Sequence, residues 1–134
     1  NPLNSAGAIG YVSEAFNPLA ILSECQQLDI PILAIRAVQA GALTSSMDRS
    51  PHESGFDKSD FDDFDKAEPF RDLAIEWGES PASLAHRYAL SIKGVASVIL
   101  GVKNRTELKE CVEAEAKDLL SDSEIQQIEN CLKG

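Results

Sequence analysis

Two short segments combine glycine, small residues and basic side chains in the way that anion-binding turns do. The first is Arg36–Thr44, and the second is Gly101–Arg105, which contains Lys103. Each follows an apolar run, and the second precedes a periodic helix. A helix N-terminus offers free N–H groups, and small residues let a phosphate approach the backbone. The spacing alone favours an ordinary strand-to-helix turn bearing solvated basic side chains, and phosphate binding at these turns is the alternative that it allows.

Other kinds of site chemistry have little support in this sequence. The signatures GxSxG, HExxH and the P-loop are absent. Cys25, Cys111 and Cys131 are widely spaced and form no zinc or CxxC pattern, so each is predicted to be a small buried residue on a helix. His86 lies off the apolar stripe of its helix and is predicted to be a surface or polar-contact histidine. We expect no catalytic residue and no metal site.

The periodicity predicts the elements that position the two turns. Apolar runs without alternation at 31–36 and 95–100 are typical of strands buried on both faces. A 3.6-residue period predicts helices over 19–28, 66–78 and from Ser80, which Pro81 follows at the first helical position. Two more helices are expected after Asn104 and Ser121, each with a glutamate at the capping-box position. The inward stripes predicted for these two helices are Leu108, Cys111 and Val112, and Ile125, Ile128 and Leu132.

The segment from 45 to 65 has no helical period. Phe56, Phe61 and Phe64 alternate there with five aspartates. The spacing fails as an EF-hand because a phenylalanine occupies the fifth ligand position and no glycine occupies the sixth. We therefore predict a mobile acidic loop whose aromatic residues can fold over a neighbouring cleft.

Length and charge limit the class of protein. The 134 residues fit one domain, and a formal net charge of -10 disfavours nucleic acid or an anionic membrane surface as partner. The odd cysteine count favours the cytoplasm. Strands alternating with helices predict a parallel sheet, but only two full strands and a third fragment near Asn1–Ser5 are visible. Such a sheet has open edges, which indicates part of a larger sheet or one shared with a partner.

Four segments in order resemble the aldo-keto reductases. They are Arg36–Thr44, the helix Ser80–Leu90, the stretch Gly101–Cys111, and Asp118–Asp122 before the last helix. The resemblance covers essentially all 134 residues but only about the last third of such an enzyme. It implies an α/β fold: a partial (β/α)8 TIM barrel, with roughly the last two to three βα units and the C-terminal helix.

The resemblance also implies roles for individual residues. The cofactor's pyrophosphate would be lined by Arg36, Ala37, Val38 and Gly41. The adenosine ribose and its 2′-phosphate would be surrounded by Gly101, Val102, Lys103 and Asn104. Glu107 occupies a position where the family often has Arg or Gln, Glu110 would accept from the adenine amino group, and Cys111 replaces a frequent Asn. The implied cofactor is NADP, resting on Lys103 with Arg105 in support, with NAD as the alternative.

The function implied is the C-terminal part of an NAD(P)H-dependent carbonyl reductase acting on a small carbonyl substrate. The family's catalytic Tyr, Lys, Asp and His come from the first half of the barrel, so residues 1–134 alone are expected to be inactive. The alternative hypothesis is a non-catalytic structural or interaction module that forms homo-oligomers through its exposed sheet edges.

Overall fold

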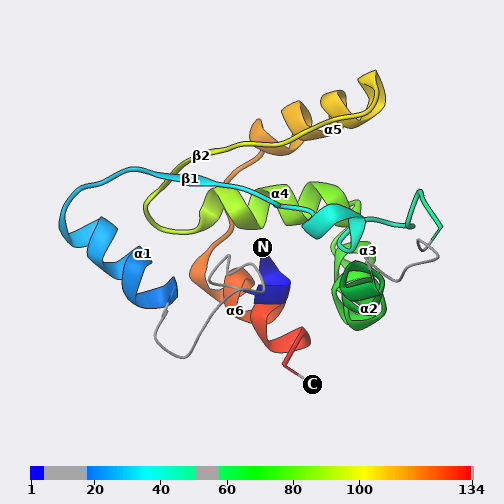
Figure 1. The fold of residues 1–134 in the computed structure, drawn as a ribbon, viewed down its shortest axis with the longest axis horizontal. Helices are drawn as coiled ribbons and strands as arrows, with labels where there is room; N and C mark the ends of the chain where they lie inside the picture. Colours follow the sequence, from blue (N-terminus) through cyan, green and yellow to red (C-terminus); the bar gives the residue numbers. More distant parts are fainter. Residues whose placement is uncertain (5–17, 51–57, 134) are drawn as a thin grey trace.

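Six α-helices and two short strands make up the chain (Figure 1), in a computed structural model that describes residues 1–4, 18–50 and 58–133. In chain order the elements are η1 (Pro2–Asn4), α1 (Pro18–Gln27), β1 (Ile32–Ala34), η2 (Gln39–Gly41), α2 (Lys58–Lys66), α3 (Glu68–Glu76), α4 (Pro81–Ser91), β2 (Val95–Val98), α5 (Arg105–Glu115) and α6 (Asp122–Cys131). Among the described residues, no helix is long and apolar enough to cross a bilayer.

The two strands form a parallel pair, as predicted. Leu33 aligns with Ser97, and the N–H of Ile99 donates to the carbonyl of Ala34 over 2.8 Å, which extends the pairing past the end of β2. The prediction that both strands are buried is wrong for this chain, because the side chains of Leu33, Ile35 and Ile99 are each about half exposed or more. Their apolar pattern is that of a covered sheet, but few described elements pack on it.

Local capping fixes the starts of three helices, as the sequence predicts. The Ser80 hydroxyl accepts from the Ser83 N–H over 3.0 Å, with Pro81 at the first helical position. Asn104 caps α5, and Ser121 forms a complete capping box with Glu124 at the start of α6. These side chains satisfy N–H groups that have no partner inside their helices.

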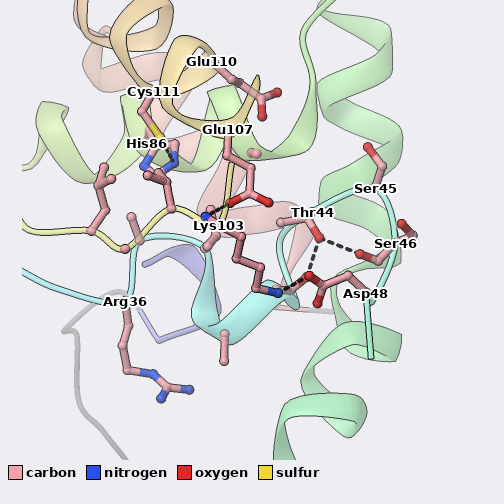
Figure 2. A pocket seen from close by; sticks show the side chains of 18 of the residues that line it. Arg36, Thr44, Ser45, Ser46, Asp48, His86, Lys103, Glu107, Glu110 and Cys111 are labelled. Carbon is pink, nitrogen blue, oxygen red and sulfur yellow. Dashed lines mark hydrogen bonds and ion pairs between the residues drawn. The ribbon is translucent and has the colours of Figure 1, made fainter. Parts of the chain in front are cut away.

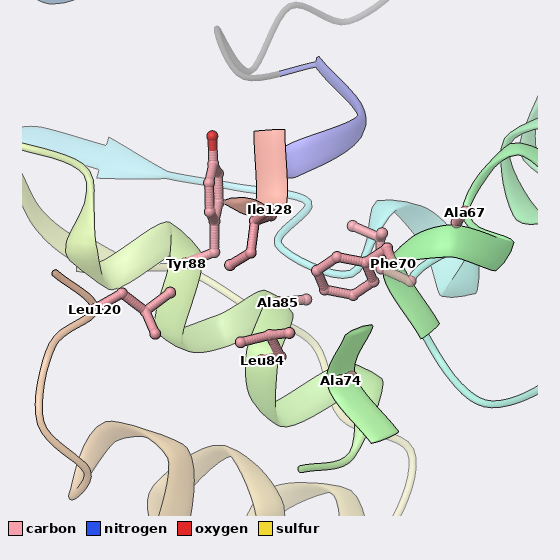
Figure 3. Packing of buried hydrophobic residues seen from close by; sticks show 9 residues of the cluster. Ala67, Phe70, Ala74, Leu84, Ala85, Tyr88, Leu120 and Ile128 are labelled. Carbon is pink, nitrogen blue, oxygen red and sulfur yellow. The ribbon is translucent and has the colours of Figure 1, made fainter. Parts of the chain in front are cut away.

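The hydrophobic core lies between helices α3, α4 and α6 and not against the sheet (Figure 3). The apolar stripes of these helices supply most of it, and Leu43, Ala67 and Leu120 add to it from outside the three helices. Its buried members are Leu43, Ala67, Phe70, Ala74, Leu84, Ala85, Tyr88, Leu120 and Ile128. By contrast, the predicted inward stripe of α5 is wrong, because Leu108 and Val112 are about half exposed and only Ala114 is buried on that helix. The core is therefore helical, and α4 joins it to the sheet side.

Two further predictions are wrong. Residues 58–65 belong to helix α2 and not to an acidic loop. The helix predicted over 66–78 is confirmed as α3, which Ala67 separates from α2. Residues 45–50 contain no helix or strand, as expected of a loop, and 51–57, with Phe56, lie outside the described residues. The third strand fragment is absent from residues 1–4, where Pro2–Asn4 forms a 3-10 turn.

Candidate functional site

A cavity of about 610 Å³ opens where the chain leaves β1 and β2 (Figure 2). Every residue predicted for the site except Asn104 lines it: Arg36, Ala37, Val38, Gly41, Gly101, Val102, Lys103, Glu107, Glu110 and Cys111. The two predicted turns therefore meet, as expected when the carboxyl ends of parallel strands lie at one edge of a sheet. Ala40 and Thr44, which also line the cavity, lie within the first predicted turn. Sequence reasoning did not find the remaining lining residues, which are Ser45, Ser46, Asp48, Arg49, Ala82, His86 and Leu100.

The first turn has unusual backbone geometry. Arg36, Gln39 and Ala40 have φ of 54°, 46° and 52°, the left-handed region that non-glycine residues rarely occupy, and Gly41 follows with φ of 99°. Among the described residues, no intrachain hydrogen bond uses the N–H groups of Ala37, Val38 or Ala40. Successive free amides in such a turn form a concave anion-binding surface.

Helix α2 holds this turn by its carboxylates. Asp60 accepts from Arg36 over 3.0 Å and from Arg49 over 2.7 Å, and Asp63 accepts from the Gln39 side chain over 3.0 Å. Figure 2 shows Arg36 extending away from Lys103. These contacts explain why 58–66 is helical without an apolar stripe: interactions with residues distant in sequence stabilise it, and periodicity does not reveal them.

The second turn leads into α5, and the N–H groups of the second and third residues of this helix are already satisfied. The Asn104 side chain accepts from the N–H of Thr106 over 2.9 Å and of Glu107 over 3.0 Å. The Glu107 carboxylate then accepts from the Lys103 N–H over 2.7 Å and from the Asn104 side-chain amide over 3.0 Å. In a capping box Glu107 would accept from the N–H of the cap residue Asn104, and here it accepts from the N–H of Lys103 and from the Asn104 side chain. This arrangement is a variation on the predicted capping box. A carboxylate of the chain occupies the position where an external anion would bind.

An ion pair joins the second turn to the segment that follows the first turn. The Lys103 ammonium donates to the Asp48 carboxylate (Figure 2). This hydrogen bond from Lys103 is the main cause that lowers the pKa of Asp48 below its ordinary value. Both side chains are more than half exposed, so the pair is screened by solvent and salt. The pair reduces the positive charge that Lys103 presents to a ligand, because the Asp48 carboxylate neutralises the lysine.

The far end of the cavity holds a histidine and a cysteine. His86 Nε2 and Cys111 Sγ are 3.2 Å apart, and the Ser80 hydroxyl donates to the Glu110 carboxylate. Among the described residues, His86 Nδ1 is buried without a hydrogen-bond partner. The polar contact of His86 is as predicted, but a surface position is wrong, because α5 packs on α4 and His86 is 6% exposed.

Both members of this pair are held neutral. Burial lowers the pKa of His86, although the charge of Glu110 acts in the opposite direction. Burial raises the pKa of the Cys111 thiol, and the charges of Glu110 and Glu107 raise it further. A nucleophilic cysteine needs a depressed pKa, so this pair is not a thiolate–imidazolium catalyst. The three cysteines lie on helices as predicted, but they are half-buried and not fully buried.

A cluster of polar side chains around Glu79 stabilises the N-terminal end of α4. Glu79 pairs with Arg87 and Lys117 and accepts from the Ser83 hydroxyl. Burial opposes ionisation of Glu79, but the hydrogen bonds from Lys117 and Ser83 and the charge of Arg87 outweigh it, so its pKa lies below the ordinary value. Among the described residues, no group of three or more His, Cys, Asp or Glu side chains is placed to hold a metal ion.

Comparison with known proteins gives one positive finding. A family model described as Aldo/keto reductase family matches residues 11–133. No curated protein matches the chain. The matched range contains both turns, the helices that carry the core and every residue that lines the cavity.

Proposed function

The chain belongs to the aldo/keto reductase family, and we propose that its cavity binds the adenosine and pyrophosphate part of a nicotinamide cofactor in an NAD(P)H-dependent carbonyl reductase. The observation that carries the proposal is the meeting of Arg36–Gly41 with Gly101–Cys111 around one cavity. A volume of about 610 Å³ lies within the range of small-molecule sites. The family supports oxidoreductase chemistry, and the substrate class of small carbonyl compounds is part of the proposal.

The residues fit the charged part of such a cofactor. The free N–H groups of Ala37, Val38 and Ala40 can donate to pyrophosphate oxygens, and Gly41 leaves room for close approach. When bound, the nicotinamide supplies the hydride that reduces the carbonyl carbon. The residues of this chain bind and orient the cofactor and exclude water from its phosphates. We propose that barrel segments continuing the sheet beyond β1 and β2 carry the proton donor.

Gly41 offers a direct test with a matched control. Gly41→Ala places a side chain at φ of 99° inside the cavity, 3.4 Å from the sulfur of Met47. Gly78→Ala places one at φ of 71° outside the cavity, with nothing within 4 Å. Both substitutions strain the backbone by about 1 kcal/mol. We expect only Gly41→Ala to weaken dinucleotide binding, by about tenfold, measured by quenching of protein fluorescence with NADH and NADPH.

The test is made on the complete polypeptide that contains residues 1–134. Equal loss of binding in the two variants would mean that strain and not the cavity is responsible. If neither dinucleotide binds the wild type, the proposed function is wrong. Oligomers seen by sedimentation would then favour the alternative, a structural or interaction module that forms homo-oligomers through its exposed sheet edges.

A further inference from the structure

We infer, resting on the proposed function, that the adenosine end of the cavity accepts an unphosphorylated ribose, so that NAD(H) binds in preference to NADP(H), and that Glu107 determines this preference. The sequence-based prediction of NADP rests on Lys103. The surroundings of Lys103 and Glu107 favour the other cofactor for three separate reasons, which concern cations, N–H donors and net charge.

The cations that could attract a 2′-phosphate already have carboxylate partners. Lys103 donates to Asp48, and Arg36 and Arg49 both donate to Asp60. Arg105, the other basic residue of the second turn, does not line the cavity. A phosphate that used Lys103 would have to displace Asp48 or share the lysine with it. This requirement removes most of the attraction that Lys103 provides by itself.

Three backbone donors at the second turn are also taken. Asn104 accepts from Thr106 and Glu107, and Glu107 accepts from Lys103, all over 2.7–3.0 Å. A phosphate at the start of α5 would need these same N–H groups. The chain has therefore placed its own amide oxygen and carboxylate where a bound phosphate would be held.

The remaining charge at this end is negative. Asp48, Glu107 and Glu110 all line the cavity with Lys103, and the two arginines that also line it are paired with Asp60. A 2′-phosphate would add about two negative charges beside Glu107. A ribose diol would instead donate to it, because each carboxylate oxygen of Glu107 accepts one hydrogen bond within the chain and has capacity for another. An acidic residue that accepts from the 2′-hydroxyl is the usual device for selecting NAD in dinucleotide sites.

The test measures dissociation constants of NADH and NADPH on the complete polypeptide and on Glu107→Gln. We expect wild type to bind NADH at least about tenfold more tightly. Glu107→Gln keeps the size of the side chain and removes its charge, so NADPH binding should improve about tenfold while NADH binding weakens slightly. The matched control is Glu113→Gln, on the same helix, exposed and paired only with Lys109, and it should leave both constants unchanged.

A second measurement needs no variant, in case Glu107→Gln does not fold. Adenosine 2′,5′-bisphosphate and AMP differ only in the 2′-phosphate. Both compete with NADH for the site, and AMP should compete at least about fivefold better if the ribose site rejects a 2′-phosphate. Tighter NADPH binding in wild type, or a Glu107→Gln ratio equal to that of wild type, overturns this inference and leaves the proposed function standing. Absence of binding by both dinucleotides overturns the proposed function itself.

Discussion

The helical core and the two-stranded sheet use equally apolar sequences but reach opposite degrees of burial. Phe70, Leu84 and Tyr88 are fully buried between α3, α4 and α6. Leu33 and Ile99 of the sheet region are more than half exposed. Amphipathic helices can cover one another within a short chain, whereas a parallel strand pair has two faces and two edges to cover.

The difference separates the part that the 134 residues bury by their own contacts from the part that they leave exposed. The core closes through contacts between helices, with Tyr88 also donating to Glu129 over 2.9 Å. Burial raises the pKa of Tyr88 well above its ordinary range, and the bond to Glu129 raises it further, so this hydroxyl stays protonated. The sheet, in contrast, carries an apolar sequence whose burial depends on further layers.

The largest expected effect tests the comparison directly in the 134-residue chain. Phe70→Ala should lower the free energy of unfolding by about 3–5 kcal/mol, because it empties a closed site. Leu33→Ala should cost less than about 1 kcal/mol, since Leu33 is 59% exposed. Ile75→Ala is the matched control, an exposed apolar residue on a core helix. Urea denaturation measures all three, and an equal cost at Leu33 and Phe70 would contradict the comparison.

An intermediate effect is expected where α4 faces the cavity, at the junction of the two regions. Because burial lowers the pKa of His86, the unfolded chain binds a proton more readily than the folded chain. Stability should therefore fall as pH drops below about 6.5, the ordinary histidine value, with a slope of at most about 1.4 kcal/mol per pH unit. The loss ends below the folded-state pKa, where both states are protonated.

His86→Leu separates this contribution from the others. The variant places an apolar side chain of similar volume there and has no proton to bind, so the free energy of unfolding should fall less steeply as pH drops from 7 to 5. Part of the remaining slope comes from the Asn1 amino group, whose pKa burial lowers to about 6. Carboxylates titrate mainly below this window. Urea denaturation at four or five pH values makes the measurement. If the slope of the free energy of unfolding against pH is unchanged in His86→Leu, solvent reaches His86 and the junction is less buried than the core.

The smallest expected effect lies on the exposed side of the cavity. Asp48→Asn removes the partner of Lys103, and because both side chains are exposed, we expect no measurable change in thermal midpoint. Freeing the lysine should improve NADPH binding about two- to threefold. Asp62→Asn, which removes the exposed pair with Lys58 on α2, is the matched control. A clear fall in thermal midpoint at Asp48 only would mean that the cavity region is held as firmly as the core.

Sequence reasoning succeeded where the cause of structure is local. Ser80, Asn104 and Ser121 cap their helices through side chains within three residues, and the apolar stripe of α4 is buried as its period predicts. It failed where the cause lies elsewhere. Nothing near 58–66 reveals that Asp60 pairs with Arg36, 24 positions away. The prediction that both strands are buried failed for the same reason. An apolar run shows that a strand can be buried, but it does not show that other elements pack on it.

The candidate site also has features that could be predicted from the sequence and features that could not. The two turns could be predicted because parallel strands place their carboxyl ends at one edge, and the structure brings Arg36 and Lys103 to one cavity. The role of Asp48 could not, because it depends on a contact with Lys103 across 55 positions. His86 was assigned to the surface because a single-helix period does not show that α5 packs over it.

The double contact of Asp60 with Arg36 and Arg49 gives the cavity a dependence on ionic strength that the core lacks. Both arginines are more than one third exposed, so dissolved ions reach these pairs. Rising salt should loosen the hold of α2 on the first turn, while excluded salts such as sulfate strengthen the burial of Phe70 and its neighbours. The medium can therefore change the shape of the cavity without unfolding the domain.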